Sequence, residues 1–214
     1  MSSATLHPDL ASLYDHLAPD YDRLHRRWLR HAGGEAQAAL EAAVRAVATP
    51  NMELLDAGCG TGAFARRLLA DTQIAPRITL LDPSEAMLAR CADIPAKRVQ
   101  GRLEELPFAS DHFDIVCCAW ALETTTNLER SVKELCRVVR PGGLLCLAFC
   151  AQTASQGILG RAMTLALSLR GSGRFLLADE IRTALAEQDS FELRHLPCNG
   201  PAAALIIRRT LEQS

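Results

Sequence analysis

This chain lacks several features that would assign it to a class of protein at once. None of its segments has the run of about 18 apolar residues that spans a membrane. Its N-terminus, MSSATLHPDL, lacks the basic start and apolar stretch of a secretory signal peptide. Basic residues are not in excess either: the formal net charge is −2, whereas nucleic-acid-binding proteins usually carry a basic surplus. These absences favour a cytoplasmic protein with no integral membrane segment and no nucleic-acid partner.

Paired cysteine motifs are also missing. The sequence has eight cysteines but no CxxC pair, and most of them fall inside expected strands and helices, as Cys117, Cys118 and Cys146 do. This distribution favours small core residues in a reducing compartment, and we predict no metal site. A thiol site for zinc or arsenic is the alternative.

The length and composition fit one domain. With 214 residues, of which 49% are apolar and 22% charged, the chain can bury one sizeable core, and two full domains would be cramped. Residues 1–48 are helical in pattern, and Pro19 is expected to end the first helix, because proline disfavours helix in the residue before it. Residues 49–214 are expected to form the main domain.

The stretch from Glu53 to Ala65, ELLDAGCGTGAFA, is the most informative part of the sequence. It predicts a short buried strand, a glycine turn with GxGxG spacing and then a helix. Glycines at such a turn allow a positive φ and let a ligand approach bare N–H groups at a helix start. Asp56 ends the strand just before the turn. An acid there would repel a pyrophosphate but would hold a cationic or amine-bearing ligand, so the pattern differs from the GxGxxG of dinucleotide sites.

Strands and helices alternate after this turn. The alternation predicts crossover connections and a parallel sheet. Asn127 is expected to cap the helix that follows it. Near the C-terminus, the link from 197 to 201 is too short for a crossover, so its two flanking strands should pair antiparallel. The strands are expected at 52–55, 78–81, 98–100, 113–119, 144–149, 191–196 and 202–208, and the later helices at 128–139, 158–169 and 176–188.

A series of motifs resembles the class I S-adenosylmethionine-dependent methyltransferases. LLDAGCGTGAFA is similar to the family's first motif, ITLLDPSEAML to its second, LEELPFASDHFDIVCCAWALE to its third and fourth, and ELCRVVRPGGLLCLAF to its fifth. The resemblance covers roughly residues 50–150. It implies a three-layer Rossmann-like α/β sandwich whose mostly parallel sheet has the strand order 3-2-1-4-5-7-6, with strand 7 antiparallel.

The resemblance implies S-adenosylmethionine as the cofactor. Asp82, at the end of the second strand, would accept both ribose hydroxyls, although nicotinamide enzymes place an acid similarly. The glycine turn would lie against the amino acid part of the cofactor. Met87 would pack on the adenine, with a plain core position as the alternative. The expected cofactor-binding residues are Tyr14, Tyr21, Asp56, Gly58, Cys59, Gly60, Asp82, Pro83, Met87, Leu103, Glu104 and Ala119.

One motif departs from the family pattern. Many members have Gly-Asp-Ala where this chain has Gly101-Arg102-Leu103, and their aspartate accepts a hydrogen bond from the adenine amino group. Arginine has no acceptor atom, so we expect Glu104 or the backbone of Leu103 to make this contact. The alternative for Arg102 and Glu104 is a surface charge.

Glu123 is the candidate catalytic residue. It ends the motif that begins at Cys117, where the family often has a histidine facing the acceptor. A carboxylate there could orient a hydroxyl or amine, or take its proton as a general base. A solvent-facing helix cap is the alternative.

The acceptor is expected to be a small molecule with an apolar or aromatic body. The segment LYDHLAPDYDRLHRRWLR is similar to the entry segment of the quinone-biosynthesis methyltransferases, which folds over the cofactor, so residues 1–48 should cover the active site. Asp15, Asp20 and Asp22 suggest that this segment is exposed. The apolar span 157–170 is expected to cover the acceptor, with Met163 in contact and core packing as the alternative.

Three other functions are open. The first is N-methylation of a lipid headgroup during peripheral contact with a membrane, with Arg26, Arg27 and Arg30 at the surface. The second is a binding protein that senses S-adenosylmethionine without chemistry. The third is a nicotinamide-dependent oxidoreductase. The sequence does not indicate an oligomeric state.

Overall fold

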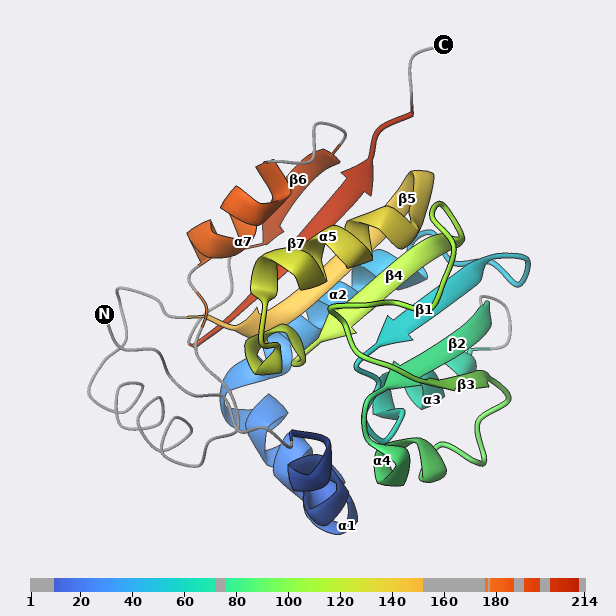
Figure 1. Ribbon diagram of the computed structural model, residues 1–214, viewed down its shortest axis with the longest axis vertical. Helices are drawn as coiled ribbons and strands as arrows, with labels where there is room; N and C mark the ends of the chain where they lie inside the picture. The colour runs from blue at the N-terminus through green and yellow to red at the C-terminus, as the bar shows by residue number, and fades with distance from the viewer. Residues whose placement is uncertain are drawn as a thin grey trace.

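The computed structural model describes residues 10–71, 76–151, 176, 178–186, 191–196 and 201–211. These residues build a seven-stranded sheet in the order β3-β2-β1-β4-β5-β7-β6 (Figure 1). The first five strands pair in parallel, and β7 pairs antiparallel with both β5 and β6. The predicted Rossmann-like topology is confirmed. The strands are β1 Glu53–Ala57, β2 Arg77–Asp82, β3 Lys97–Gln100, β4 Phe113–Ala119, β5 Val139–Cys150, β6 Phe191–Leu196 and β7 Ala202–Arg209.

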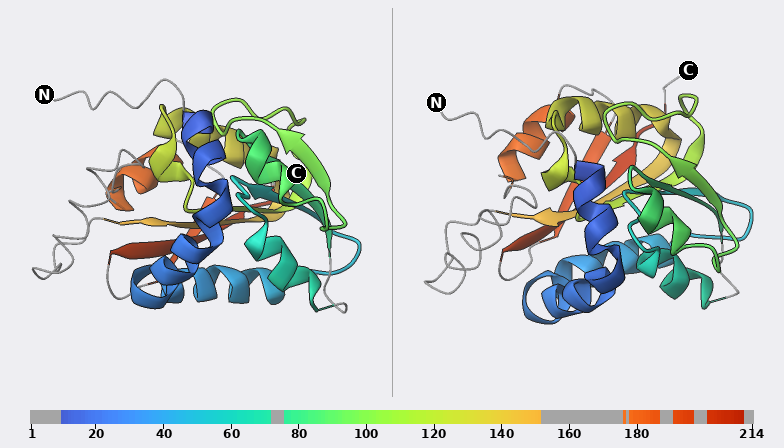
Figure 2. Two further views of the ribbon diagram at one scale, coloured as in Figure 1. Left: turned by 90° about the horizontal axis from the view of Figure 1, so that it is seen from below. Right: turned by 60° about the horizontal axis from the view of Figure 1, so that its bottom comes forward.

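Helices cover both faces of the sheet, which gives three layers (Figures 1 and 2). Each face has its own apolar cluster: Leu55 and Ala57 pack with α5 and α7, whereas Leu54 packs on the other side with α2 and α3. Because side chains alternate along a strand, Asp56 points to the same face as Leu54. The helices of these layers are α2 Gly34–Arg45, α3 Ala63–Leu69, α4 Glu85–Ala89, α5 Leu128–Val138 and α7 Ala178–Ala186.

Two of these helices begin at a polar N-cap residue whose side chain accepts a hydrogen bond from a free backbone N–H group of the first turn. The Asn127 side chain accepts a hydrogen bond of 2.9 Å from the Arg130 N–H, which confirms the predicted cap of α5. The hydroxyl of Ser84 accepts one of 3.1 Å from the Met87 N–H and so caps α4 directly after β2. The last described helix, α7, lies within the helix expected at 176–188, of which residues 177, 187 and 188 lie outside the described residues. The expected apolar helix at 158–169, with Met163, lies outside the described residues.

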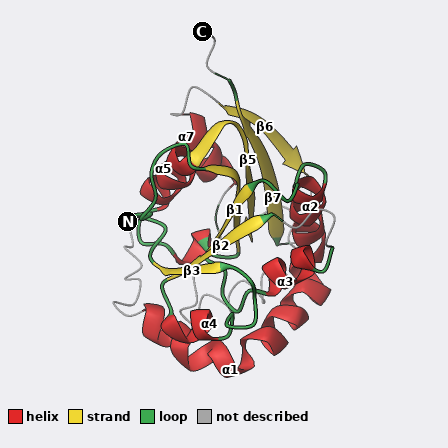
Figure 3. Cartoon of the chain, turned by 90° about the vertical axis from the view of Figure 1, so that its right-hand side faces the viewer, coloured by secondary structure: helices red, strands yellow, loops and turns green. Residues whose placement is uncertain are grey.

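The N-terminal helix α1, Leu10–Trp28, runs across the carboxyl ends of the strands (Figures 2 and 3). It continues through the short π-helix Leu29–Gly33 into α2. The prediction that Pro19 ends this helix is wrong, since Pro19 lies inside it. A proline inside a helix costs about 3 kcal/mol. Tertiary contacts on both sides of it offset that cost.

Two aspartates supply those contacts. The Asp15 side chain accepts hydrogen bonds from the Ser84 hydroxyl at 2.5 Å and from the Ala86 N–H at 3.2 Å. Beyond Pro19, the Asp22 side chain accepts one of 2.5 Å from the Thr61 hydroxyl. Asp15 is exposed, as expected, and Asp22 is half-buried, but both side chains also attach α1 to the glycine turn and to the start of α4.

Among the residues that the structure describes, no helix combines the length and the apolar character needed to cross a bilayer.

Candidate functional site

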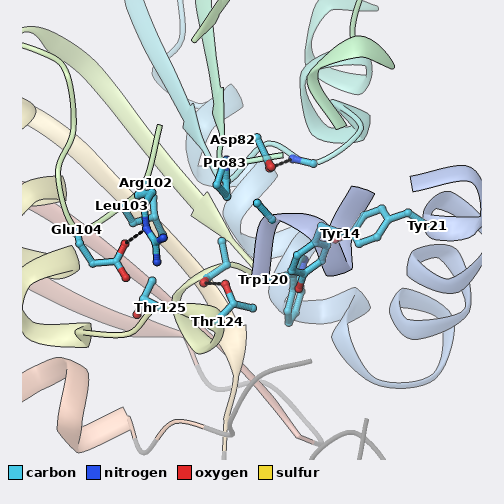
Figure 4. Close-up of a pocket in the computed structure, with 14 residues that line it drawn as sticks. Tyr14, Tyr21, Asp82, Pro83, Arg102, Leu103, Glu104, Trp120, Thr124 and Thr125 are labelled. Carbon is cyan, nitrogen blue, oxygen red and sulfur yellow. Dashed lines mark hydrogen bonds and ion pairs between the residues drawn. The ribbon is translucent and has the colours of Figure 1, made fainter. Parts of the chain in front are cut away.

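An open cavity lies at the carboxyl ends of β1, β2 and β4, beneath α1 (Figure 4). The empty space, counted out to its solvent-open mouth, is about 670 Å³. Loops after parallel strands diverge at such an edge and leave a crevice there. We call it the first cavity. It is lined by Ala11, Tyr14, Tyr21, Gly58, Gly60, Asp82, Pro83, Arg102, Leu103, Glu104, Trp120, Ala121, Thr124 and Thr125.

The glycine turn forms the floor of this cavity. The N–H groups of Gly58 and Cys59 both donate to the Leu81 carbonyl, at 2.7 and 2.9 Å, which ties the turn to the end of β2. Gly58 has a φ of 77°, and a Cβ on it would lie 2.4 Å from the Cβ of Ala121. Only glycine fits both restrictions, so backbone rather than side chain faces the cavity here.

Asp82 is held by the backbone around it. One carboxylate oxygen accepts a hydrogen bond of 2.8 Å from the Gly60 N–H, and the other accepts one of 2.9 Å from the Ser84 N–H. Burial raises the pKa of Asp82 to about 6, and these two backbone hydrogen bonds oppose the rise. A carboxylate has more acceptor sites than these two bonds use, so Asp82 can still accept hydrogen bonds from a ligand.

A second cavity lies on the α2 and α3 side of the glycine turn. Asp56 lines it and has one carboxylate oxygen, Oδ2, that is buried without a hydrogen-bond partner. Burial, together with the nearby charge of Asp82, raises the pKa of Asp56 to about 7. The full lining is Tyr21, His25, Gln37, Asp56, Gly58, Cys59, Thr61, Ala63, Phe64, Arg67, Ala119 and Trp120.

Trp120 lines both cavities and was not predicted as a site residue. Its φ of 60° is unusual for a residue with a bulky side chain, and such strain costs on the order of 1–3 kcal/mol. The indole N–H donates to Oε1 of Gln37 at 2.7 Å, and the ring packs edge-on against Trp28. The sequence signal was its place directly after Ala119 at the end of β4, where site residues gather.

The loop after β3 forms another wall of the first cavity. The Glu104 side chain accepts hydrogen bonds from the N–H and hydroxyl of Thr126, at 2.8 and 2.9 Å. Its other oxygen lies 3.7 Å from Nε of Arg102. Although burial raises the pKa of Glu104, the Thr126 hydrogen bonds and Arg102 bring it below its usual value. Glu104 is therefore an ionised acceptor beside the cavity, and Leu103 contributes an apolar surface next to it.

Two predicted site residues do not line either cavity. Met87 is buried, at 1% exposure, and belongs to α4. Glu123 lies in the 3-10 helix Leu122–Thr124, where one carboxylate oxygen accepts a hydrogen bond of 3.1 Å from the Cys150 N–H. The other oxygen is buried without a partner, and burial raises the pKa of the carboxyl group. Its neighbours Thr124 and Thr125 do line the first cavity.

The remaining predicted residues gather around the two cavities. Tyr14, Gly60, Asp82, Pro83, Leu103 and Glu104 line the first, Asp56, Cys59 and Ala119 line the second, and Tyr21 and Gly58 line both. Besides Trp120, the sequence reasoning did not assign Thr124, Arg67, Gln37 and His25 to the site. In the part of the chain that the structure describes, no three His, Cys, Asp or Glu side chains form a group that could hold a metal ion.

Residues 55–147 match a family model described as a methyltransferase domain. A malonyl-[acyl-carrier protein] O-methyltransferase of Pectobacterium atrosepticum is 34% identical over 65% of this chain and 52% of that protein. A ubiquinone/menaquinone biosynthesis C-methyltransferase of Methylobacterium nodulans is 36% identical over 59% of this chain and 50% of that protein. The chain thus spans about half the length of these curated relatives.

A solved structure shares the fold. It is an S-adenosylmethionine-dependent methyltransferase of Thermotoga maritima, described as a possible histamine N-methyltransferase. The TM-score is 0.69 at 19% identity, and the match covers 93% of this chain and 99% of that one. At this identity the likeness supports the architecture alone.

Proposed function

We propose that this chain, whose residues 55–147 match a methyltransferase-domain family, is a class I S-adenosylmethionine-dependent methyltransferase and that it methylates a small molecule. The observation that supports this most is the pair of buried aspartates on either side of the glycine turn. Asp82 faces one cavity with acceptor capacity to spare, and Asp56 faces the other with an unpaired oxygen. A ligand with two hydroxyls in its middle and a cationic group at one end fits both cavities, with the hydroxyls at Asp82 and the cation at Asp56.

In this proposal the first cavity takes the nucleoside part of the cofactor. Asp82 accepts the ribose hydroxyls, as its remaining lone pairs allow. Pro83 and Leu103 provide apolar surface for the adenine, and Glu104 accepts from its amino group. Met87, expected to pack on the adenine, is buried in α4 and lines neither cavity.

The turn itself takes the amino acid part of the cofactor. Asp56 attracts the ammonium group, and Gly58, Cys59 and Gly60 present backbone to it. When bound, the cofactor would supply a methyl group on a sulfonium. The neutral thioether that remains after methyl transfer is a good leaving group. The chain then has to position the acceptor and exclude water, which needs no metal.

The same features argue against a nicotinamide dinucleotide. Its pyrophosphate would lie at the glycine turn, where the Asp56 carboxylate would repel it. The spacing of the turn, GxGxG, also differs from the dinucleotide pattern.

We propose an acceptor with an apolar or aromatic body, covered by the N-terminal segment 1–48, of which the structure describes residues 10–48. Ala11, Tyr14, Trp120 and Ala121 contribute apolar or aromatic surface to the lining of the first cavity. Glu123 is the proposed base or orienting group: burial raises the pKa of its carboxyl group, one of its oxygens has no partner, and its neighbours Thr124 and Thr125 line the first cavity. Seven described cysteines are free thiols, which accords with a reducing cytoplasm.

One surface feature favours a second acceptor class. Arg26, Arg27 and Arg30 are all exposed around the end of α1, next to the cover of the cavity. A phospholipid headgroup at a membrane surface is therefore kept as the alternative acceptor.

The test begins with binding. Calorimetry and thermal denaturation should show that S-adenosylmethionine binds and stabilises the chain, by about 2.7 kcal/mol at a hundredfold excess over Kd, while NAD does not. A methyl-label transfer screen against quinols, phenols, amines and phospholipid vesicles then identifies the acceptor class. Stabilisation by NAD alone would overturn the proposal, and binding without transfer to any acceptor would favour a sensor.

A further inference from the structure

We propose that Arg67 binds the carboxylate of the cofactor, so that the second cavity selects a ligand end carrying both an ammonium and a carboxylate. This inference rests on the proposed function but concerns residues that neither the motifs nor the comparisons assign. It adds the cationic half of a charge pair whose anionic half is Asp56.

The charges that line the second cavity are complementary to a zwitterion. Asp56 enters from the end of β1 and Arg67 from α3. His25 on α1 stacks on Tyr21, and burial and the nearby Arg67 lower its pKa to about 4, so it is neutral. Gln37 and Thr61 add uncharged polar groups. A simple anion would be repelled by Asp56 and a simple cation by Arg67, whereas an amino acid end satisfies both.

The unpaired oxygen of Asp56 indicates that this cavity is built for a ligand. Asp56 is only 3% exposed, and its Oδ2 has no hydrogen-bond partner. Burying such a group without a partner is costly, roughly 1–3 kcal/mol. An ammonium group placed in the cavity would supply the missing donor and leave Arg67 for the carboxylate at its other end.

Arg67 is held in place before any ligand arrives. Its Nε and Nη2 donate to Oε1 of Glu41 on α2, at 2.9 and 2.6 Å. The same oxygen accepts from Nε2 of Gln37 at 2.8 Å, and Gln37 in turn accepts from the Trp120 indole. A guanidinium carries more N–H donors than the two bonds to Glu41 use, and its flat fork matches a carboxylate.

Side chains of α2 thereby contribute to the recognition of the ligand's carboxylate end. Glu41 orients Arg67, and the chain of hydrogen bonds through Gln37 ends at Trp120, which lines both cavities. Side chains of α2 therefore link Arg67 in the second cavity to Trp120, which borders both cavities.

The test compares two ligands that differ only in the carboxylate: S-adenosylmethionine and its decarboxylated analogue. Calorimetry on the full chain should show that Arg67→Met weakens S-adenosylmethionine by roughly ten- to a hundredfold, the range for charge-assisted hydrogen bonds. The same variant should bind the decarboxylated analogue within about twofold of wild type, since that ligand never uses Arg67. Arg67→Lys, which keeps the charge but loses the fork, should fall between wild type and Arg67→Met.

The matched control is Arg45→Met. Arg45 donates to the Arg67 carbonyl at 2.7 Å but lines neither cavity, so its loss should affect the two ligands equally. Thermal denaturation checks that each variant is folded. If Arg67→Met does not fold, Glu41→Gln replaces it as the test variant. That change loosens Arg67, and it too should weaken only the ligand with a carboxylate. Equal weakening of both ligands by Arg67→Met would overturn this inference alone. Failure of the wild-type chain to bind either ligand would overturn the proposed function, and this inference with it.

Discussion

Asp56 and Asp82 lie at the same edge of the sheet, on neighbouring parallel strands, yet they are in opposite states. Both are buried, at 3% and 6% exposure. Asp82 takes a backbone N–H on each carboxylate oxygen, whereas Asp56 has an oxygen with no partner. Asp82 therefore helps to build the turn as well as to face a ligand. Asp56 is left for the ligand to satisfy.

The pKa values follow from this difference. Burial raises both, but the hydrogen bonds from Gly60 and Ser84 hold Asp82 at about 6, while Asp56 rises to about 7. Proteins bury unsatisfied carboxyl groups rarely, and chiefly where a site needs them. Equal position and equal burial therefore do not make two acids equivalent.

Glu123 is a third buried acid, and its substitution is expected to have the largest effect, on turnover. Like Asp56 it has one unpaired oxygen, but its other oxygen accepts from the Cys150 N–H. Glu123→Gln keeps that acceptor and the side-chain shape, so S-adenosylmethionine affinity should hold while turnover falls by roughly a hundredfold, the lower range for a general base. Steady-state kinetics and calorimetry on the same preparation measure both. Equal turnover would return Glu123 to a structural role.

Asp82→Ala should give the next largest effect, since it removes a ligand contact and two backbone hydrogen bonds together. Affinity for S-adenosylmethionine should fall by roughly ten- to a hundredfold, as expected for lost hydrogen bonds of about 1.5–3 kcal/mol to a charged group. The free energy of unfolding should fall as well, because the N–H groups of Gly60 and Ser84 lose their acceptor. Urea denaturation and calorimetry separate the two losses. Unchanged affinity in a folded variant would remove Asp82 from the site.

Asp56→Asn and Asp82→Ala should change the stability of the fold in opposite directions: the first should raise it and the second should lower it. In wild type the folded pKa, about 7, lies above the ordinary value of 3.8, so the folded state binds more protons between these pH values. Asp56 therefore costs stability increasingly as pH rises through that range, and the cost is constant above it. Asparagine carries no such cost.

The variant should consequently unfold at a higher temperature than wild type at pH 8, with a smaller difference at pH 5. Its affinity for S-adenosylmethionine should fall by about tenfold, in line with one charge-assisted contact. Thermal denaturation at both pH values and calorimetry at pH 8 measure this. A variant that is less stable at pH 8 would mean that Asp56 has a partner after all.

Arg102→Asp is expected to have the smallest effect. It restores the acceptor that many family members have beside the adenine, and it lies in the wall of the first cavity, away from Asp56. Affinity for S-adenosylmethionine should stay the same or tighten slightly, with Glu104→Ala as the comparison that weakens it modestly. Loss of binding by a folded Arg102→Asp chain would show that position 102 does not lie where the aspartate of other family members does.

The sequence was sufficient for the features that follow from local pattern. Strand, glycine turn and helix are consecutive in the chain, so the alternation of elements alone placed Asp56, Gly58 and Asp82 at one sheet edge. The antiparallel pair β6 and β7 followed from the shortness of the link between them. These predictions needed only the length of a turn and the alternation of apolar residues.

Other features depend on contacts between distant residues and had no local signal. Trp120 and Gln37 are 83 positions apart, and Arg67 meets Glu41 across two helices, so no spacing rule joins them. The direction of Glu123 depends on which way a single-turn helix faces. Local propensity predicts that the helix ends at Pro19, because it takes no account of the side-chain hydrogen bonds that hold α1 on both sides of this residue.

Pro19 has one more consequence, for the stiffness of the helix that lies over the site. A proline has no N–H to donate, so the main-chain ladder of α1 is weakest where it passes this residue. Each half of the helix has its own anchor, Asp15 before the proline and Asp22 after it. A bend at that joint would therefore break fewer main-chain hydrogen bonds than a bend elsewhere in α1. Pro19, which the sequence pattern predicts to be a helix end, is in the folded chain a joint between two separately anchored halves of one helix.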